Sequence, residues 1–170
     1  IAPLHYRRCS RQIPCMPRLR ADVAVLTVIP AELNAAREAL GIDSHARTKD
    51  PDGSVYFHGS IHSQLTGGGY EIVLGCIGGA GNPGAAAAAD SIINRYQVRA
   101  LLLMGIAAGI RSKVRIGDVL ISERIVGYEP AALARVKGKP TVQPRPEIER
   151  APHTMLQDVH AYRTNPNRLT

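Results

Sequence analysis

Aliphatic runs that alternate with helical segments constrain the fold of this chain more than any other feature of its sequence. Residues 22–29 (Asp-Val-Ala-Val-Leu-Thr-Val-Ile) form the first run, and residues 70–77 and 98–106 form two more. Nearly continuous aliphatic and β-branched runs are typical of strands buried on both faces of a parallel sheet. A fourth strand is expected over residues 119–126, after Ile116-Gly-Asp118.

Helices are predicted between these strands. Pro30 suits the first turn of a helix, so we expect one over residues 31–40, with Gly41 as its C-terminal cap. An alanine-rich helix is expected over residues 83–96, and a further strand over residues 55–61. Strands that alternate with helices predict an α/β sheet with crossover helices rather than a sandwich.

The two ends of the chain lack these periodicities. Residues 1–20 contain scattered prolines and arginines but no acidic residue, so we expect a basic leader or linker. Prolines crowd residues 131–170, which predicts an irregular tail with a short helix over residues 153–162. The α/β domain is therefore expected over residues 21–130. Because the first residue is not a methionine and the pattern fades after Tyr128, we expect the N-terminal portion of a longer protein.

The net charge of +7 does not by itself indicate a nucleic-acid partner. The excess of positive charge lies in residues 1–20 and 131–170, whereas the predicted domain is slightly acidic. Aromatic residues, which stack on unpaired bases, make up only 4% of the chain. We therefore expect solvated basic ends and no nucleic-acid binding.

The cysteines and the apolar runs exclude other classes of protein. Cys9, Cys15 and Cys76 are too few for a disulfide framework, and no second Cys/His cluster completes a zinc site with the first two. We expect no metal, no cofactor and a reducing, cytoplasmic location. The longest apolar run, residues 100–110, is too short to span a bilayer, so no membrane association is expected.

Chemistry is expected in the loops that follow the strands, because ligands of open α/β sheets bind beyond the carboxyl ends of strands. Three loops qualify: residues 27–32, 78–84 and 105–109. Residues 79–84 (Gly-Ala-Gly-Asn-Pro-Gly) fit the G-x-G-x-x-G pattern of dinucleotide-binding folds. However, the acidic residue that such folds use about 20 positions further on is missing from residues 103–109. A tight turn with close helix packing is the simpler interpretation, and an NAD-dependent oxidoreductase is the weaker alternative.

Four segments then follow one another in a specific order and spacing. They are residues 25–32 (Val-Leu-Thr-Val-Ile-Pro-Ala-Glu), Gly78–Gly81 before the alanine-rich helix, residues 104–109 (Met-Gly-Ile-Ala-Ala-Gly), and residues 116–122 (Ile-Gly-Asp-Val-Leu-Ile-Ser). Over residues 21–128 the chain resembles the nucleoside phosphorylase and nucleosidase superfamily, especially its methylthioadenosine/S-adenosylhomocysteine nucleosidase branch. The resemblance implies a central twisted mixed sheet flanked by helices, a purine nucleoside or nucleotide across the strand ends, and a homodimer.

The resemblance also implies a role for Glu32, which lies where the family keeps a carboxylate beside the attacking water. Hydrolysis of an N-glycosidic bond passes through an oxocarbenium-like state, and water must be oriented and deprotonated. The dipole at a helix start keeps such a carboxylate ionised. Without the resemblance, Glu32 would be interpreted as a solvated acid in the first turn of a helix.

Two further groups of residues are implied to contact the substrate. Backbone groups of the glycine-rich loop would approach the ribose or a 5′ substituent: Gly78, Gly79, Ala80 and Gly81. The loop after the third strand would line the base and the sugar: Ile106, Ala107, Ala108 and Gly109. Gly78 stands where nucleosidases often have a serine, and Ala108 replaces a more usual glycine. Asp118 is expected to cap a turn rather than to act in catalysis.

The same loops favour water over phosphate as the nucleophile. Phosphorylases that resemble this family bind phosphate with arginines in the first loop and near the third strand. Here the first loop offers Glu32 and no arginine, and residues 101–104 (Leu-Leu-Leu-Met) are wholly apolar. Because a carboxylate repels phosphate and an apolar wall cannot hold it, hydrolysis is expected rather than phosphorolysis.

Two residues of the family's machinery find no match in residues 129–170. The family carries a later Glu beside a Met, which holds the ribose hydroxyls, and an Asp in a Ser-Asp pair, which protonates the departing base. Glu147 and Glu149 lie among prolines, and Asp158 follows Gln157 with no strand before it. We expect either that a missing part completes the site, or that the chain is a non-catalytic nucleoside-binding or scaffolding domain of a larger multidomain signalling or defence protein.

Overall fold

The computed structural model describes residues 18–63, 67–127, 131–136 and 139–164. It divides into two compact units, residues 1–108 and 109–170, and each unit is described by itself. The predicted domain, which ends at residue 130, stays a prediction, since the division of the structure falls between Ala108 and Gly109. Residues 1–17 of the predicted leader, with Cys9 and Cys15, lie outside the described residues.

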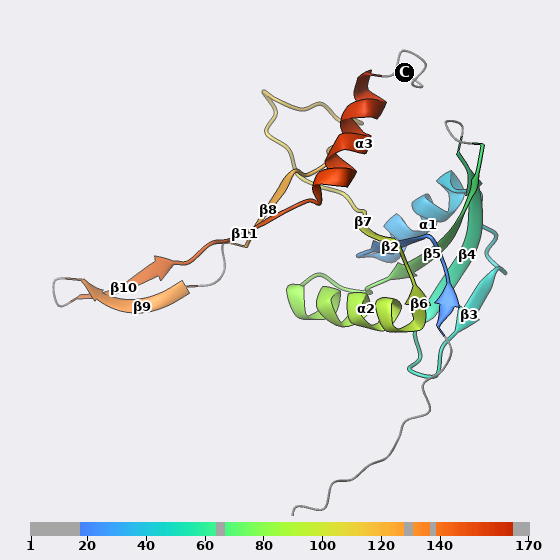
Figure 1. The fold of residues 1–170 in the computed structure, drawn as a ribbon. Coiled ribbons are helices and arrows are strands. Elements are labelled where there is room, and N and C mark those ends of the chain that lie inside the picture. The colour runs from blue at the N-terminus through green and yellow to red at the C-terminus, as the bar shows by residue number, and fades with distance from the viewer. Residues whose placement is uncertain (1–17, 64–66, 128–130, 137–138, 165–170) are drawn as a thin grey trace, which may run out of the picture. The chain divides into compact units, whose positions relative to one another are not determined.

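The first unit is built on a five-stranded mixed sheet (Figure 1). The strand order is β3 (Arg47–Lys49), β4 (Val55–His62), β5 (Gly69–Cys76), β2 (Val23–Thr27) and β7 (Ala100–Leu103). Strands β5, β2 and β7 run parallel, whereas β4 is antiparallel to both β3 and β5. The predicted α/β fold with a central mixed sheet is confirmed.

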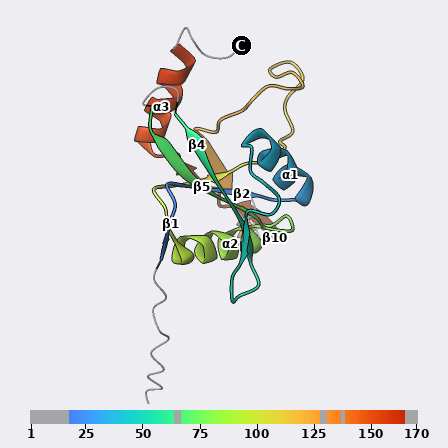
Figure 2. The same cartoon turned by 90° about the vertical axis from the view of Figure 1, so that its right-hand side faces the viewer.

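Two helices cover opposite faces of this sheet (Figures 1 and 2). Successive side chains of a strand point to opposite faces. One face packs against α2 (Asn82–Arg95) through Ala24, Leu26, Tyr56, Val73 and Ile92. The other packs against α1 (Pro30–Ala39) through Val25, Phe57, Ile72, Leu74 and Ala36. Because both faces of β2 and β5 are covered, apolar residues are needed at successive positions, which explains the continuous runs.

The ends of α1 follow the local signals in the sequence. Pro30 is its first residue, where the missing N–H of proline costs no helical hydrogen bond. Gly41 follows the C-terminal cap Leu40 and adopts a positive φ of 64°, as expected for a helix stop. The predicted helices over residues 31–40 and 83–96 therefore match α1 and α2 to within two residues.

The third aliphatic run does not form the buried strand that we expected. Strand β7 is shorter than predicted and lies at the edge of the sheet, where β2 is its partner in the described part of the chain. Leu103 is 64% exposed. An aliphatic run indicates a strand, but it does not reveal whether a neighbour covers each side.

Two residues of the expected leader belong to the first unit. Strand β1 (Leu19–Arg20) pairs in parallel with β6 (Tyr96–Gln97), which directly follows α2. This pairing uses backbone groups, so the arginine-rich sequence gives no periodicity that would predict it. The linker prediction is wrong for these two residues.

The second unit contains strands where an irregular tail was predicted. Within residues 131–170, β9 (Ala131–Val136) pairs antiparallel with β10 (Lys139–Pro144), and β11 (Glu147–Arg150) pairs antiparallel with β8 (Arg124–Gly127), which precedes the predicted tail. Among the described residues each pair is a two-stranded sheet, so every strand has one edge without a partner strand, and proline is tolerated on such edge strands. The prolines were therefore weaker strand breakers than we expected.

Other expectations for the second unit have mixed outcomes. The predicted helix is confirmed as α3 (His153–Thr164). The strand predicted over residues 119–126 is confirmed only for residues 124–126, because β8 begins at Arg124 and residues 119–123 form no strand. The predicted turn at Asp118 is confirmed, since its Oδ2 accepts a hydrogen bond from the Arg115 N–H at 2.8 Å. Among the described residues, no helix combines the length and apolar character needed to cross a membrane.

Candidate active site

Three predicted loops meet at the carboxyl ends of β5, β2 and β7. The Gly78 N–H donates to the carbonyl oxygen of Val28 at 3.0 Å, which joins the loop after β5 to the loop after β2. The Met104 N–H donates to the carbonyl oxygen of Leu26 at 2.8 Å, which aligns the loop after β7. The site is therefore assembled by backbone hydrogen bonds that continue the parallel sheet beyond its last residues.

The side chain of Glu32 folds back from the first turn of α1 over the end of β2. Its Oε2 atom accepts hydrogen bonds from the N–H groups of Val28, at 2.9 Å, and Ile29, at 3.1 Å. Its Oε1 atom accepts a third from the Ile106 N–H at 2.8 Å. A glutamate at this helical position commonly binds the N–H of the cap residue, but the bond to Ile106 also ties the first loop to the third.

These hydrogen bonds stabilise the ionised form of Glu32. The Ile106 N–H has the largest effect, followed by those of Ile29 and Val28, and together they lower the pKa of the carboxyl below its ordinary value of 4.5. Partial burial opposes them with a smaller effect. At neutral pH Glu32 is thus a fixed negative charge, suited to orient a water molecule and to stabilise a developing positive charge.

The glycine-rich loop presents exposed backbone to solvent. Gly78 has a φ of 85° and Gly81 a φ of 131°, conformations that side-chain-bearing residues rarely adopt. Gly81 is also the cap residue that precedes α2. All of residues 78–81 are exposed, so a ligand can approach their backbone groups. The predicted contacts of Gly78, Gly79, Ala80 and Gly81 with ribose stay a prediction.

The second set of predicted substrate residues falls on both sides of the division between the units. Ile106 contacts Glu32 through its N–H, while the residue as a whole is 84% exposed. Ala107 and Ala108 are exposed as well. Gly109 belongs to the second unit, where a Cβ atom added to it would collide with Val114. The structure therefore brings Ile106 to Glu32, and the roles of the other three residues stay predictions.

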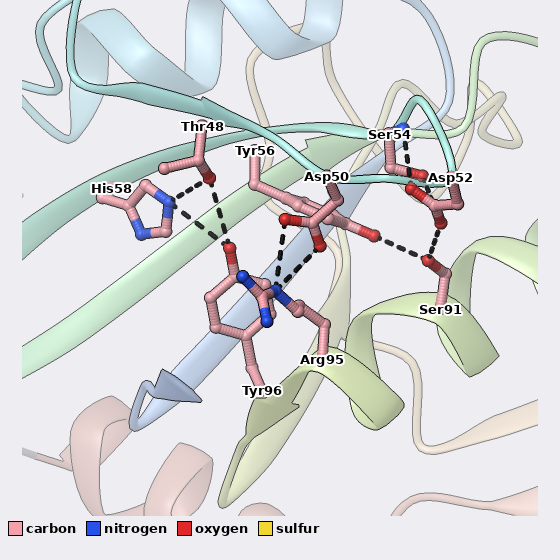
Figure 3. Close-up of polar contacts among 9 residues, drawn as sticks. All are labelled: Thr48, Asp50, Asp52, Ser54, Tyr56, His58, Ser91, Arg95 and Tyr96. Carbon is pink, nitrogen blue, oxygen red and sulfur yellow. Dashed lines mark hydrogen bonds and ion pairs between the residues drawn. The ribbon is translucent and has the colours of Figure 1, made fainter. Parts of the chain in front are cut away.

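A separate polar cluster, which the sequence analysis did not identify, lies between α2 and the β3–β4 turn (Figure 3). Asp50 and Arg95 form an ion pair with an Nε to Oδ2 distance of 3.1 Å. The Ser91 hydroxyl donates to Asp52 at 2.7 Å and accepts from the Tyr56 hydroxyl at 3.1 Å. The polar groups of the cluster pair with one another through these contacts. We therefore assign the cluster a structural role, which is to hold the β3–β4 turn against α2.

The same cluster contains a partly buried histidine (Figure 3). The His58 Nε2 atom lies 2.8 Å from the Thr48 hydroxyl and 3.4 Å from the Tyr96 hydroxyl. Burial lowers the pKa of His58, and the charges of Asp50 and Glu71 oppose this effect. Within the described ranges, no group of three or more His, Cys, Asp or Glu residues is arranged to hold a metal ion.

Comparison of the sequence with models of protein families gives the family of this chain. A sequence model of the phosphorylase superfamily matches residues 22–165. The chain belongs to this superfamily. The resemblance to nucleoside phosphorylases and nucleosidases is therefore confirmed, and the dinucleotide alternative loses its basis. The assignment to the methylthioadenosine/S-adenosylhomocysteine branch stays a prediction.

Two curated proteins that are similar to this chain carry the same name. ATP nucleosidase Cap17 of Escherichia coli strain KTE188 is 36% identical over 127 residues, which cover 75% of this chain and 24% of the relative. A second ATP nucleosidase Cap17, from Escherichia coli, has the same identity and coverage. The chain thus spans about a quarter of the length of the curated relatives it matches. No solved structure matches this chain.

Sequence reasoning missed the groups that hold Glu32 in place. Three of them are backbone N–H groups, those of Val28, Ile29 and Ile106, and these have no side-chain signature. The fourth is Gly105, where an added Cβ atom would lie only 2.8 Å from Oε1 of Glu32. Its place between an aliphatic strand and the Ile106–Gly109 loop was the available signal, because glycine there permits a close approach.

Proposed function

We propose that this chain carries part of the active site of a nucleosidase that hydrolyses the N-glycosidic bond of a purine nucleoside or nucleotide. The observation that carries the proposal is the Glu32 carboxylate, held by three backbone N–H groups where the loops after β2 and β7 meet. Membership of the phosphorylase superfamily and the similarity to an ATP nucleosidase support this chemistry.

In the proposed reaction a water oxygen forms a bond to C1′ while the C1′–N9 bond breaks and its electron pair passes to N9. Glu32 orients the water, stabilises the cationic sugar and accepts the proton of the water. Its lowered pKa favours orientation and electrostatic stabilisation over strong basicity. The departing base takes a proton at N7 from an acid that residues outside this chain would supply, and such acids contribute about 10²–10⁴-fold in rate.

Hydrolysis is preferred to phosphorolysis for an electrostatic reason. The carboxylate of Glu32 occupies the junction of the first and third loops, where a phosphate dianion would be repelled. The side chains of Leu102 and Leu103, on the strand before the third loop, offer no hydrogen-bond donor. Water, which carries no charge, is the better partner for this environment.

We further propose that the substrate is an adenine compound with or without a 5′ phosphate. The name of the ATP nucleosidases favours a nucleotide, and the exposed backbone of residues 78–81 could accommodate a 5′ substituent. A cytoplasmic location and a homodimer are part of this proposal, as the family resemblance suggests. So is the presence of additional domains in a larger protein.

A second candidate function is non-catalytic purine binding or scaffolding by the same loops. The observation that favours it is that three backbone N–H groups already bind the Glu32 carboxylate, which is also what a purely structural helix cap would show. Calorimetry separates the two candidates, since this alternative predicts heat of purine binding without release of free base.

The test of the proposal is base release from adenosine, methylthioadenosine, S-adenosylhomocysteine, AMP and ATP, followed by chromatography. The assay uses this chain and any longer natural protein that contains it, with and without inorganic phosphate. Hydrolysis predicts free adenine and a sugar with a C1′ hydroxyl, formed at the same rate without phosphate. Formation of a sugar 1-phosphate would identify a phosphorylase instead, and no release from any compound would contradict both activities.

A further inference from the structure

Gly105 makes an unusually close approach to the carboxyl group of Glu32. A Cβ atom placed on Gly105 would lie 2.8 Å from Oε1, 3.1 Å from Cδ and 3.2 Å from Oε2 of Glu32. These are its three nearest neighbours, and all belong to one carboxyl group. An alanine methyl therefore cannot share this space with the carboxylate in its present position.

The hydrogen bonds of Glu32 explain why this position matters. Each carboxylate oxygen can accept about two hydrogen bonds. Oε2 accepts from both Val28 and Ile29, while Oε1 accepts from Ile106 and from no other group among the described residues, which leaves it one acceptor direction. That direction is where a water molecule or a substrate hydroxyl can bind.

We propose that Gly105 is a positioning residue for Glu32: its missing side chain lets the carboxylate dock against the loop after β7, bind the Ile106 N–H and direct its remaining acceptor toward the substrate. The inference rests on the proposed function and extends it to a residue that does not itself touch the substrate. Gly105 acts through Glu32 alone.

The fold does not otherwise require glycine at this position. Gly105 is not among the glycines with a positive φ, so alanine is compatible with its backbone. The crowded atoms are the end of a flexible side chain, which can rotate away at small cost. Gly59 differs, because a Cβ there would lie 2.6 Å from Ile42, a buried side chain of the core. Substitution of Gly105 therefore displaces Glu32 rather than unfolding the protein.

The experiment compares Gly105→Ala with Gly69→Ala, whose added Cβ meets no atom within 4 Å, in the longest natural protein that contains this chain. On the compound that the wild type cleaves fastest, Gly105→Ala should lower kcat by about 100-fold, within the range of general acid–base catalysis, with KM changed less than about threefold. Its Tm should stay within about 4 °C of the wild type. Gly105→Ala combined with Glu32→Gln should be no slower than Glu32→Gln alone, because the two residues act as one unit.

A second readout does not depend on activity. In the wild type, NMR titration of the Glu32 carboxyl carbon should report a pKa below its ordinary value, and Gly105→Ala should raise that pKa by removing the Ile106 hydrogen bond. An unchanged kcat together with an unchanged Glu32 titration would overturn the inference. If the wild type releases no base, the proposed function fails, while the titration still decides whether Gly105 positions Glu32.

Discussion

The Glu32 carboxylate accepts a hydrogen bond from the backbone N–H of Ile106 at 2.8 Å, across 74 residues of sequence. This contact joins the start of α1 to the loop after β7 and determines where the carboxylate points. Because the donor is a backbone group fixed by the parallel sheet, the orientation of Glu32 depends on the fold and not on a neighbouring side chain. Predictions for the site and for its scaffold follow from this arrangement.

Removal of the Arg95 side chain should destabilise the first unit. Asp50 is nearly buried, with 6% of its side chain exposed, and the Arg95 guanidinium pairs with both of its oxygens, at 3.1 and 3.2 Å. Arg95→Ala leaves this charge unpaired, and we expect the free energy of unfolding to fall by about 3 kcal/mol. Urea denaturation followed by circular dichroism measures the change.

Two variants control for this effect. Arg99→Ala removes an exposed arginine and should change the stability by less than about 0.5 kcal/mol. Asp50→Asn combined with Arg95→Ala should recover part of the loss, because the buried charge is then absent. If Arg95→Ala were as stable as Arg99→Ala, the ion pair would contribute nothing to the free energy of unfolding.

Stability should fall as the pH is lowered from 7.5 toward 5.5, in part because of His58. Burial lowers the pKa of His58 below its ordinary value of 6.5. His58 therefore binds a proton more readily in the unfolded chain than in the folded chain, and protonation favours unfolding. The loss of stability starts near pH 6.5 and grows until the folded-state pKa is reached. His58→Gln should reduce the pH dependence of Tm in this window, whereas His62→Gln, at an exposed site, should preserve it. If Tm changed with pH equally in the wild type and in His58→Gln, the prediction would be refuted.

Alanine at Gly78 should be costly, whereas alanine at Gly79 should not. The φ of 85° at Gly78 lies in the left-handed region, which costs a residue with a side chain about 1–2 kcal/mol. Gly79 has no positive φ, and a Cβ on it would meet no atom within 4 Å. In thermal unfolding, Gly78→Ala should therefore have a lower Tm than Gly79→Ala. A Tm for Gly78→Ala equal to that of Gly79→Ala would argue against a strained loop.

The sequence predicted the parts of the fold that local patterns specify. Continuous aliphatic residues mark β2 and β5, Pro30 marks the start of α1, and the positive φ of Gly41 agrees with its predicted place at the helix stop. Each of these signals depends on a side chain or on the conformational freedom of one residue. They could therefore be recognised without the tertiary structure.

Features that depend on distant partners were missed. The exposure of Leu103 follows from the number of neighbours that β7 has, which an aliphatic run does not encode. The Asp50–Arg95 ion pair joins residues 45 positions apart, and the support of Glu32 by Ile106 comes from a backbone group. Glu32 became a candidate through the family resemblance, whereas the close approach of its carboxyl group to Gly105 required the structure.

The most direct test of the account measures adenine release by the wild type and by Glu32→Gln, with Glu38→Gln, an exposed acid on the same helix, as the control. The amide keeps the size of the side chain but removes the charge that, in the proposed mechanism, orients water and stabilises the cationic sugar. The account predicts that Glu32→Gln slows release by about 10²–10⁴-fold while Glu38→Gln retains the wild-type rate. Release by Glu32→Gln at the wild-type rate would contradict the central role of this carboxylate.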